Sequence, residues 1–334
     1  MQNNNRREDL DRAKGLGILL VVLGHIVARQ PPLHNEWYVV LKYAIYQFHM
    51  PFFMYLSGYV TFLSGAARLP SQAWPKLAAR RASRLLLPFV IFGLTIVAGK
   101  LLLGPYLHVD NLPMSAGQAL SALLWDTDHS PATSVWYIAV LFVLCVSTPP
   151  LLRLLAGRTR NLLLLTVALY VLPVPHVMYL DRVAGYYVFF VLGGLAAEAG
   201  EHWLGIMDRH VRGWLAALVA ALAASYFLST WLTHPAALFL CGVISMPALH
   251  GLVRLPALSK AQGLLLVGCY SFVIYLLNTP CIGLAKALLW KLMPWDGLNF
   301  LLYAPVLMAA GTFGPILIKR HLLRRIPALD RMTA

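Results

Sequence analysis

Charged residues are scarce in this sequence, and acidic ones are the scarcest. Only 12% of the 334 residues are charged, against 59% hydrophobic, and 13 Asp and Glu stand against 27 Lys and Arg. This balance is typical of polytopic membrane proteins and excludes two soluble domains. The net charge of +14 does not indicate nucleic-acid binding, because the basic residues fall in short clusters between apolar runs.

Motifs of several enzyme and metal-binding classes are also missing. The four cysteines lie inside apolar runs, where they behave as small hydrophobic residues without pairing or metal spacing: Cys145, Cys241, Cys269 and Cys281. No Gly-rich phosphate loop, zinc motif or nucleophile elbow is present. No internal repeat is evident, which argues against transporter folds built from repeats. We expect no bound metal.

Long apolar runs are what the sequence has instead. They predict an all-α polytopic membrane protein with about ten transmembrane helices, at 15–33, 40–63, 85–104, 134–152, 161–174, 183–200, 213–232, 236–252, 263–289 and 298–318. We expect a single membrane domain over residues 1–334, with no fused extracytoplasmic domain. The start resembles a signal peptide, but His25 within the run and the lack of a clean cleavage site favour a retained span.

The basic residues predict the orientation. With the N-terminus inside, 21 of the 27 Lys and Arg fall in cytoplasmic segments, so both termini are expected to be cytoplasmic. The longest outer connection, 105–133, carries His108, Asp110, Asp126, Asp128 and His129. It is either a lid near the acceptor or a solvated linker, and its spacing defines no metal site.

The first span combines a charged start with a buried imidazole. Asp11-x-x-Lys14-Gly15 precedes an apolar run that ends at Gly24-His25. Helical rise places His25 about 16 Å beyond Lys14, inside the bilayer. An ionisable residue there is costly and is usually functional, although a structural histidine bonded to a neighbouring helix is the alternative. We expect a path from Lys14 to His25.

The second span contains Phe48-His49-Met50-Pro51, followed by Ser57-Gly58-Tyr59. Pro51 bends the helix and frees carbonyl groups about one turn earlier, so a polar pocket is expected near His49.

These pieces together resemble the acyltransferase-3 family of bacterial membrane acyltransferases, which modify sugars of surface polysaccharides and lipopolysaccharide. The resemblance extends over most of the chain and rests on Asp11-x-x-Lys14-Gly15 with His25, Phe48-His49-Met50-Pro51, Ser57-Gly58-Tyr59, Arg81-x-x-Arg84, Trp136-Tyr137-Ile138 and Gly268-x-x-Ser271-x-x-x-Tyr275-Leu276. Two positions depart from the family pattern. Lys14 stands where arginine is frequent and lacks its bidentate fork, and Asn278 stands where many relatives carry histidine.

The resemblance implies an O-acyltransferase of the bacterial cytoplasmic (inner) membrane. It would transfer an acyl group, usually acetyl from cytoplasmic acetyl-CoA, to a hydroxyl of an outer carbohydrate such as a polysaccharide, lipopolysaccharide or lipid-linked glycan. Succinyl transfer is an alternative. Membrane lipids surround the protein, no nucleic-acid partner is expected, and a homo-oligomer or partners in glycan assembly remain open.

Acyl transfer to a hydroxyl needs a base and groups that stabilise an oxyanion. Apolar surroundings favour neutral imidazole, so His25, with Lys14 beside the path, is the candidate base. An acyl-imidazole intermediate on His25 is the rival mechanism.

The donor phosphates are expected at the cytoplasmic basic rim. Arg81 and Arg84 share a face at i, i+3 and are predicted to grip a phosphate, with Arg80 and Arg12 nearby. Alternatively, these arginines only fix the topology or contact lipid headgroups.

For the acceptor, polar or aromatic groups within apolar spans are the candidates: His49, Trp136, Tyr275 and Asn278. Trp136 is otherwise an interfacial belt residue, and Tyr275 and Asn278 are otherwise contacts between helices. A sugar or lipid-precursor transporter, with His25 and His49 as a proton relay, is the competing function class. A purely structural membrane subunit is the third.

Overall fold

The computed structural model describes residues 7–27, 31–103 and 115–333, and most of these residues are helical. The α-helices are α1 Glu8–His25, α2 Glu36–Tyr46, α3 His49–Leu63, α4 Trp74–Arg81, α5 Leu87–Leu103, α6 Ala116–Leu124, α7 Trp136–Leu154, α8 Thr159–Val171, α9 Leu180–Ala199, α10 Glu201–Phe227, α11 His234–Arg254, α12 Gln262–Cys269, α13 Ser271–Trp290, α14 Asn299–His321 and α15 Pro327–Met332. Within the described residues there is no strand, only a β-bridge between Leu33 and Asp296. The predicted all-α class is confirmed.

Seven helical stretches in the described part of the chain are long and apolar enough to cross a membrane. They are Ser71–Leu102, Thr133–Leu154, Leu180–Ala199, Glu201–Phe227, His234–Arg254, Ser271–Trp290 and Asn299–Arg325. They correspond to the third, fourth and sixth to tenth predicted spans. The protein is therefore a polytopic membrane protein, while ten crossings and two cytoplasmic termini stay predictions.

The other three predicted spans differ for identifiable reasons. The first was placed at 15–33, but α1 begins at Glu8, where acidic residues in its first turn favour a helix N-terminus, and ends at His25. The second, 40–63, is broken into α2 and α3 at Phe48, whose backbone leaves the helix with φ −141°. The fifth, 161–174, overlaps α8, a helix of only 13 residues.

Two predicted helices that carry sequence motifs also differ in detail from the structure. Pro51 is the third residue of α3, where its missing N–H breaks no hydrogen bond, so the break precedes the proline. The ninth predicted span, 263–289, is divided at Tyr270 into α12 and α13.

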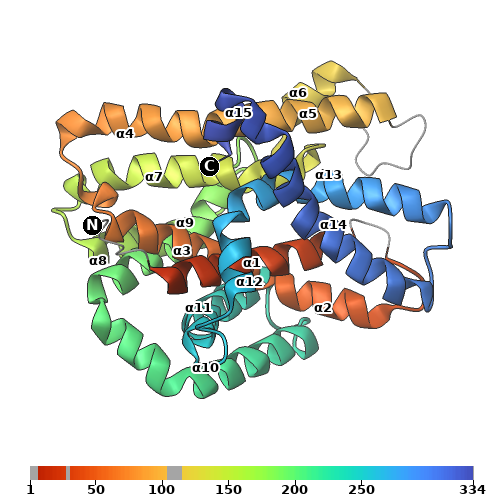
Figure 1. Ribbon diagram of the computed structural model, residues 1–334. Coiled ribbons are helices and arrows are strands. Elements are labelled where there is room, and N and C mark those ends of the chain that lie inside the picture. Colours follow the sequence, from red (N-terminus) through yellow and green to blue (C-terminus); the bar gives the residue numbers. More distant parts are fainter. Residues whose placement is uncertain (1–6, 28–30, 104–114, 334) are drawn as a thin grey trace.

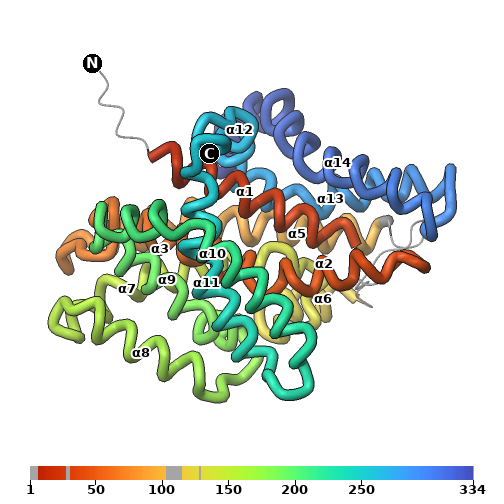
Figure 2. The backbone as a smooth tube through the Cα atoms, turned by 90° about the horizontal axis from the view of Figure 1, so that it is seen from below, coloured from red at the N-terminus to blue at the C-terminus, as the bar shows by residue number. Residues whose placement is uncertain are grey.

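Helix α1 lies among six other helices. It contacts α2, α3, α11, α12, α13 and α14, and Figure 1 shows it near the middle of the molecule. Figure 2, from below, shows α1 beside α12 and α13 as well. Any side chain at its end is therefore placed by several helices at once.

Glycine permits the close approach of α1 and α12. A Cβ atom on Gly15 would overlap the carbonyl oxygen of Leu264, and one on Gly268 would overlap that of Asp11. The same is true where α3 crosses α9, since a Cβ on Gly58 would overlap the Phe190 carbonyl. Small residues at such crossings allow the backbones of membrane helices to pack tightly.

Candidate active site

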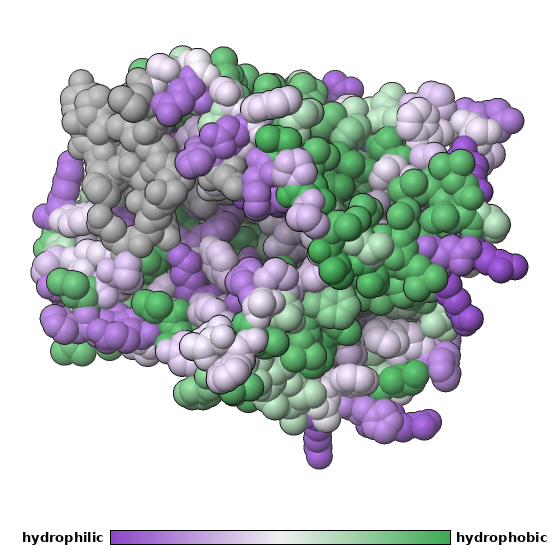
Figure 3. Space-filling view, turned by 180° about the vertical axis from the view of Figure 1, so that it is seen from behind, coloured by the Kyte–Doolittle hydropathy of each residue, from purple (hydrophilic) through white to green (hydrophobic). Residues whose placement is uncertain are grey.

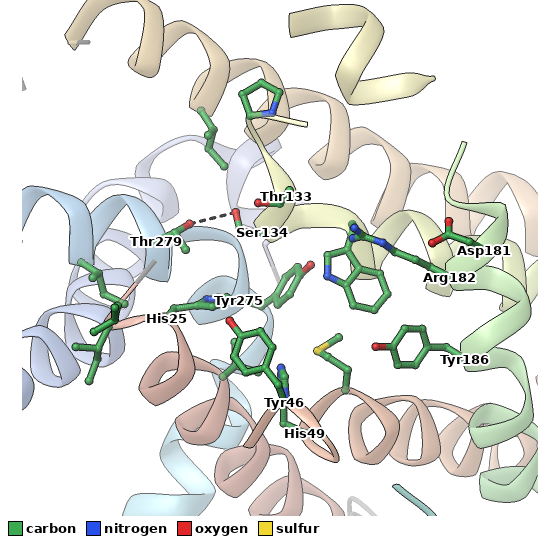
Figure 4. A pocket seen from close by; sticks show the side chains of 18 of the residues that line it. His25, Tyr46, His49, Thr133, Ser134, Asp181, Arg182, Tyr186, Tyr275 and Thr279 are labelled. Atoms are coloured by element: carbon green, nitrogen blue, oxygen red, sulfur yellow. Dashed lines mark hydrogen bonds between the residues drawn. The ribbon is translucent and has the colours of Figure 1, made fainter. Parts of the chain in front are cut away.

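A cavity of about 1400 Å³ lies at the end of the molecule where α1 finishes. Its walls come from the last turns of α1 and α5, most of the length of α13, the first residues of α3, α7, α9 and α11, and the end of α8 with the segment after it. Four of the predicted site residues line it, from four different helices: His25, His49, Trp136 and Tyr275 (Figure 4). The motifs spread along the sequence are thus brought to one place.

His25 is the last residue of α1 and is held by Asn278 of α13. Its Nδ1 lies 2.7 Å from the Asn278 Oδ1. The Asn278 Nδ2 donates to the carbonyl oxygens of Ile274 at 2.9 Å and Tyr275 at 2.8 Å. Since both amide hydrogens are used, the amide oxygen faces the imidazole and accepts from Nδ1–H. The lone pair of neutral His25 is then on Nε2.

Asn278 lies outside the lining of the cavity. Its side chain is fully buried and does not line the cavity, whereas His25 and Tyr275 do. Asn278 touches His25 and its own helix, and its predicted role as a substrate contact stays a prediction.

His49 begins α3 on the neighbouring wall. Its Nδ1 donates to the carbonyl oxygen of Ile45 at 2.8 Å, which leaves Nε2 as the acceptor of the neutral ring. The rings of His49 and Tyr46 are 4.9 Å apart, and Tyr46 also lines the cavity. The helix break between α2 and α3 supplies the polar surroundings that Pro51 was expected to create.

Trp136 and Tyr275 are two of the aromatic residues that line the cavity. The Arg182 guanidinium lies 4.9 Å from the centre of the Trp136 ring, and the Tyr186 ring lies 5.0 Å from it. The Tyr275 hydroxyl accepts the backbone N–H of Tyr137 at 3.0 Å. Arg182 and Tyr186 therefore cover part of the Trp136 ring, and a ligand can stack only on the part that they leave uncovered.

Several cavity residues were not predicted. Hydroxyl, charged and aromatic side chains are among them, for example Tyr46, Thr133, Ser134, Asp181, Arg182 and Tyr186. Ser134 accepts from the Thr279 hydroxyl at 3.1 Å, which ties α13 to the turn before α7 (Figure 4). Arg182 carried a usable signal, because it is a basic residue outside the predicted cytoplasmic segments. The others carried none.

The basic residues at the start of α1 lie apart from this cavity. Lys14 pairs with Asp11 at 3.2 Å, and Arg12 pairs with Glu8 at 2.7 Å. Lys14 precedes His25 by eleven residues, about three helical turns, so the two share a face of α1. No lining residue joins the cavity to Lys14 in the described part of the structure. The expected path is therefore not open here.

The arginine cluster forms a second, smaller recess of about 490 Å³. Arg80, Ser83 and Arg84 line it together with Arg331 of α15, whereas Arg81 does not. Arg84 thus shares this recess with Arg80, and the predicted grip of Arg81 and Arg84 on a phosphate stays a prediction. Arg84 lies in the π-helical segment Ala82–Leu86, whose i→i+5 bonds change the register of an ordinary helix.

The structure describes only part of the predicted outer connection 105–133. His108 and Asp110 lie outside the described residues. Asp126 and His129 form an exposed pair at 3.0 Å, and the side chain of Asp128 is not described. Over the residues that are described, no three His, Cys, Asp or Glu side chains are grouped to hold a metal.

Comparison with known proteins decides the family. A family model described as an acyltransferase domain matches residues 7–320. The chain belongs to this acyltransferase-3 family. Its seven long apolar helical stretches make it a membrane protein of that family.

Two relatives are similar to part of the chain. One is the nodulation protein NolL of Sinorhizobium fredii (strain NBRC 101917 / NGR234), 27% identical over 212 residues, which are 62% of this chain and 53% of the relative. The other is NolL of Mesorhizobium japonicum (strain LMG 29417 / CECT 9101 / MAFF 303099), 27% identical over 233 residues, 68% of this chain and 57% of the relative. The chain thus spans a little over half of their length. No solved structure matches.

Proposed function

We propose that this acyltransferase moves an acyl group, acetyl in the first place, from cytoplasmic acyl-CoA to a hydroxyl of an exported or cell-surface carbohydrate in a bacterial inner membrane. The observation that carries the proposal is His25, fixed by Asn278 on the wall of a cavity large enough for a sugar chain. Both substrates meet within this membrane domain.

In the proposed reaction His25 is the general base. Its Nε2 takes the proton of the acceptor hydroxyl while the hydroxyl oxygen attacks the thioester carbonyl. The C–S bond then breaks, and the CoA sulfur leaves with the proton returned by the imidazolium. The hydrogen bond from Nδ1–H to Asn278 supports this role, because it keeps Nε2 unprotonated and aimed away from α13.

The rival route forms an acyl-imidazole on His25 before the sugar attacks. It uses the same nitrogen, so the geometry supports both. A burst of CoA release without acceptor separates them, since only the covalent route releases one CoA per protein before the sugar is added.

For the donor we propose that Arg80, Arg84 and Arg81 bind the CoA phosphates, with Lys14 and Arg12 near its arm. The recess shared by Arg80 and Arg84 supports this assignment, because guanidinium groups pair well with phosphate. Since the cavity does not extend to Lys14, the thioester must approach His25 through a rearrangement along α1.

The test uses purified protein with labelled acetyl-CoA and glycan fractions from the cell surface, measuring both label transfer and CoA release. His25→Ala is expected to lower transfer by at least about 10²-fold. His202→Ala, an exposed histidine of α10 outside the cavity, is the matched control and should keep wild-type activity. Equal transfer by wild type and His25→Ala would refute the role of His25.

A further inference from the structure

Six basic residues fall outside the cytoplasmic segments that hold the other 21 of the 27. They are Arg29, Lys42, Lys100, Arg182, Lys286 and Lys291. The positive-inside rule explains the 21 basic residues of the predicted cytoplasmic segments. It does not explain basic residues elsewhere in a membrane protein, so the other six need a separate reason.

Four of these six residues line the same cavity as His25. Lys100 comes from the end of α5, Arg182 from the start of α9, and Lys286 and Lys291 from the end of α13. Of the remaining two, Lys42 donates to the Val27 carbonyl at 2.6 Å, and Arg29 lies outside the described residues. The exceptions are therefore concentrated around one hollow.

Aromatic rings support two of these cations. Arg182 lies 4.9 Å from the Trp136 ring and 5.5 Å from the Tyr179 ring. Lys286 lies 4.0 Å from the Trp295 ring. Such contacts stabilise the charge without neutralising it. In Figure 4, Arg182 extends beside Asp181 on the wall opposite His25.

The cavity walls carry an excess of positive charge. Among the described lining residues Asp181 is the only carboxylate, and it lies 3.3 Å from His176. The described lining therefore presents more cationic than anionic side chains, a balance that favours an anionic ligand. Cations that reach for lipid headgroups are instead expected around the periphery of the bundle. Figure 3 shows a hollow bordered by hydrophilic residues, beside a broad hydrophobic surface.

We infer that the acceptor is an anionic carbohydrate, bearing carboxylate or phosphate groups that Lys100, Arg182, Lys286 and Lys291 bind in this cavity. The inference rests on the proposed function and adds the chemical class of the acceptor. The charged groups hold the sugar in the wide part of the cavity, and a hydroxyl reaches His25 at the end of α1.

The probe is tetragalacturonate, and its fully methyl-esterified form is the uncharged control. Binding to purified protein in zwitterionic lipid is measured by titration of tryptophan fluorescence, without any acyl donor. We expect the acid to bind at least ten-fold more tightly than the ester at low salt, with the difference shrinking as salt is added. The double variant R182Q/K286Q should reduce the preference to less than two-fold.

Lysine 260, a basic residue outside the cavity, provides the control variant K260Q, which should keep the full preference. Equal affinity for acid and ester, or no binding of either, overturns the inference. A third result would also overturn it: the protein requires anionic lipid, R182Q/K286Q abolishes that requirement, and sugar binding does not depend on the charge of the sugar. These cations would then contact lipid headgroups. The proposed function is tested separately, by the dependence of acyl transfer on His25. It still holds if a neutral glycan is the better acceptor.

Discussion

At the scale of single residues, the orientation of one amide determines what His25 can do. Asn278 has both amide hydrogens on carbonyls of its own helix, so its oxygen has one direction left, toward His25. The sequence offered Asn278 only as a departure from the family pattern. The two partners are 253 positions apart in the sequence, and no local pattern could pair them.

Replacing Asn278 by leucine should impair catalysis more than binding. Without the acceptor at Nδ1 the imidazole is free to turn or to take the other tautomer, so we expect kcat to fall about ten-fold or more while KM for acetyl-CoA changes less than two-fold. Steady-state kinetics over a range of pH measures both. N278D keeps an acceptor at the same position and should retain more activity than N278L. Wild-type kcat in N278L would contradict the positioning role.

Sequence reasoning predicted some of the cavity residues but few of those that surround them. His25, His49, Trp136 and Tyr275 were predicted and line one cavity, because an ionisable or aromatic residue in an apolar run is visible in the sequence. Tyr186 and Thr133 are ordinary membrane-helix residues by type, and only the fold places them at the cavity.

At the scale of helices, backbone geometry accounts for the two main departures from prediction. The break at Phe48 and the π-helical segment Ala82–Leu86 both change which side chains share a face. Hydropathy locates an apolar helix, but it does not distinguish α from π hydrogen bonding or reveal a two-residue break.

The arginine recess makes a prediction that separates the two possible pairs. R80Q/R84Q should raise KM for acetyl-CoA at least ten-fold, because both residues line the recess. R81Q/R84Q removes the same charge but only one lining arginine, and it should raise KM less. Steady-state kinetics with acetyl-CoA as the varied substrate provides the check, and equal effects of the two double variants would contradict the pairing.

The crossing of α1 and α12 makes a second prediction at this scale. G268A should destabilise the protein by about 1–3 kcal/mol, because a Cβ there overlaps the Asp11 carbonyl and pushes α1 away. G263A, on the same helix with no atom within 4 Å of an added Cβ, should be neutral or slightly stabilising, by about 0.4–1 kcal/mol. Thermal unfolding in detergent compares the two. Equal Tm values would show that the crossing tolerates a methyl group.

At the scale of the whole molecule, the distribution of charge fits the position of the cavity. The cavity lies where α1 and α5 end, away from the charged start of α1 with its paired acidic and basic residues. Composition alone predicted a polytopic helical membrane protein. The number of crossings depends on short or polar helices such as α1 and α8, which hydropathy judges poorly.

The predicted orientation can be tested by labelling. L298C, at an exposed position before α14, is expected on the outer side, and Q72C, exposed before α4, on the cytoplasmic side. A membrane-impermeant maleimide should label L298C in intact cells and Q72C only after permeabilisation, measured against the unmodified protein as background. Labelling in the opposite order would overturn the orientation and with it the cytoplasmic source of the donor.

The most direct test of the central claim is rescue of His25→Ala by free imidazole. The cavity leaves room for a small base where the side chain is removed. If His25 Nε2 takes the hydroxyl proton, acyl transfer by His25→Ala should recover saturably as imidazole is added, and more strongly at a pH where imidazole is neutral. A variant that remains fully active without imidazole, or one that a matched neutral imidazole never restores while acetyl-CoA and the sugar still bind, would contradict the account.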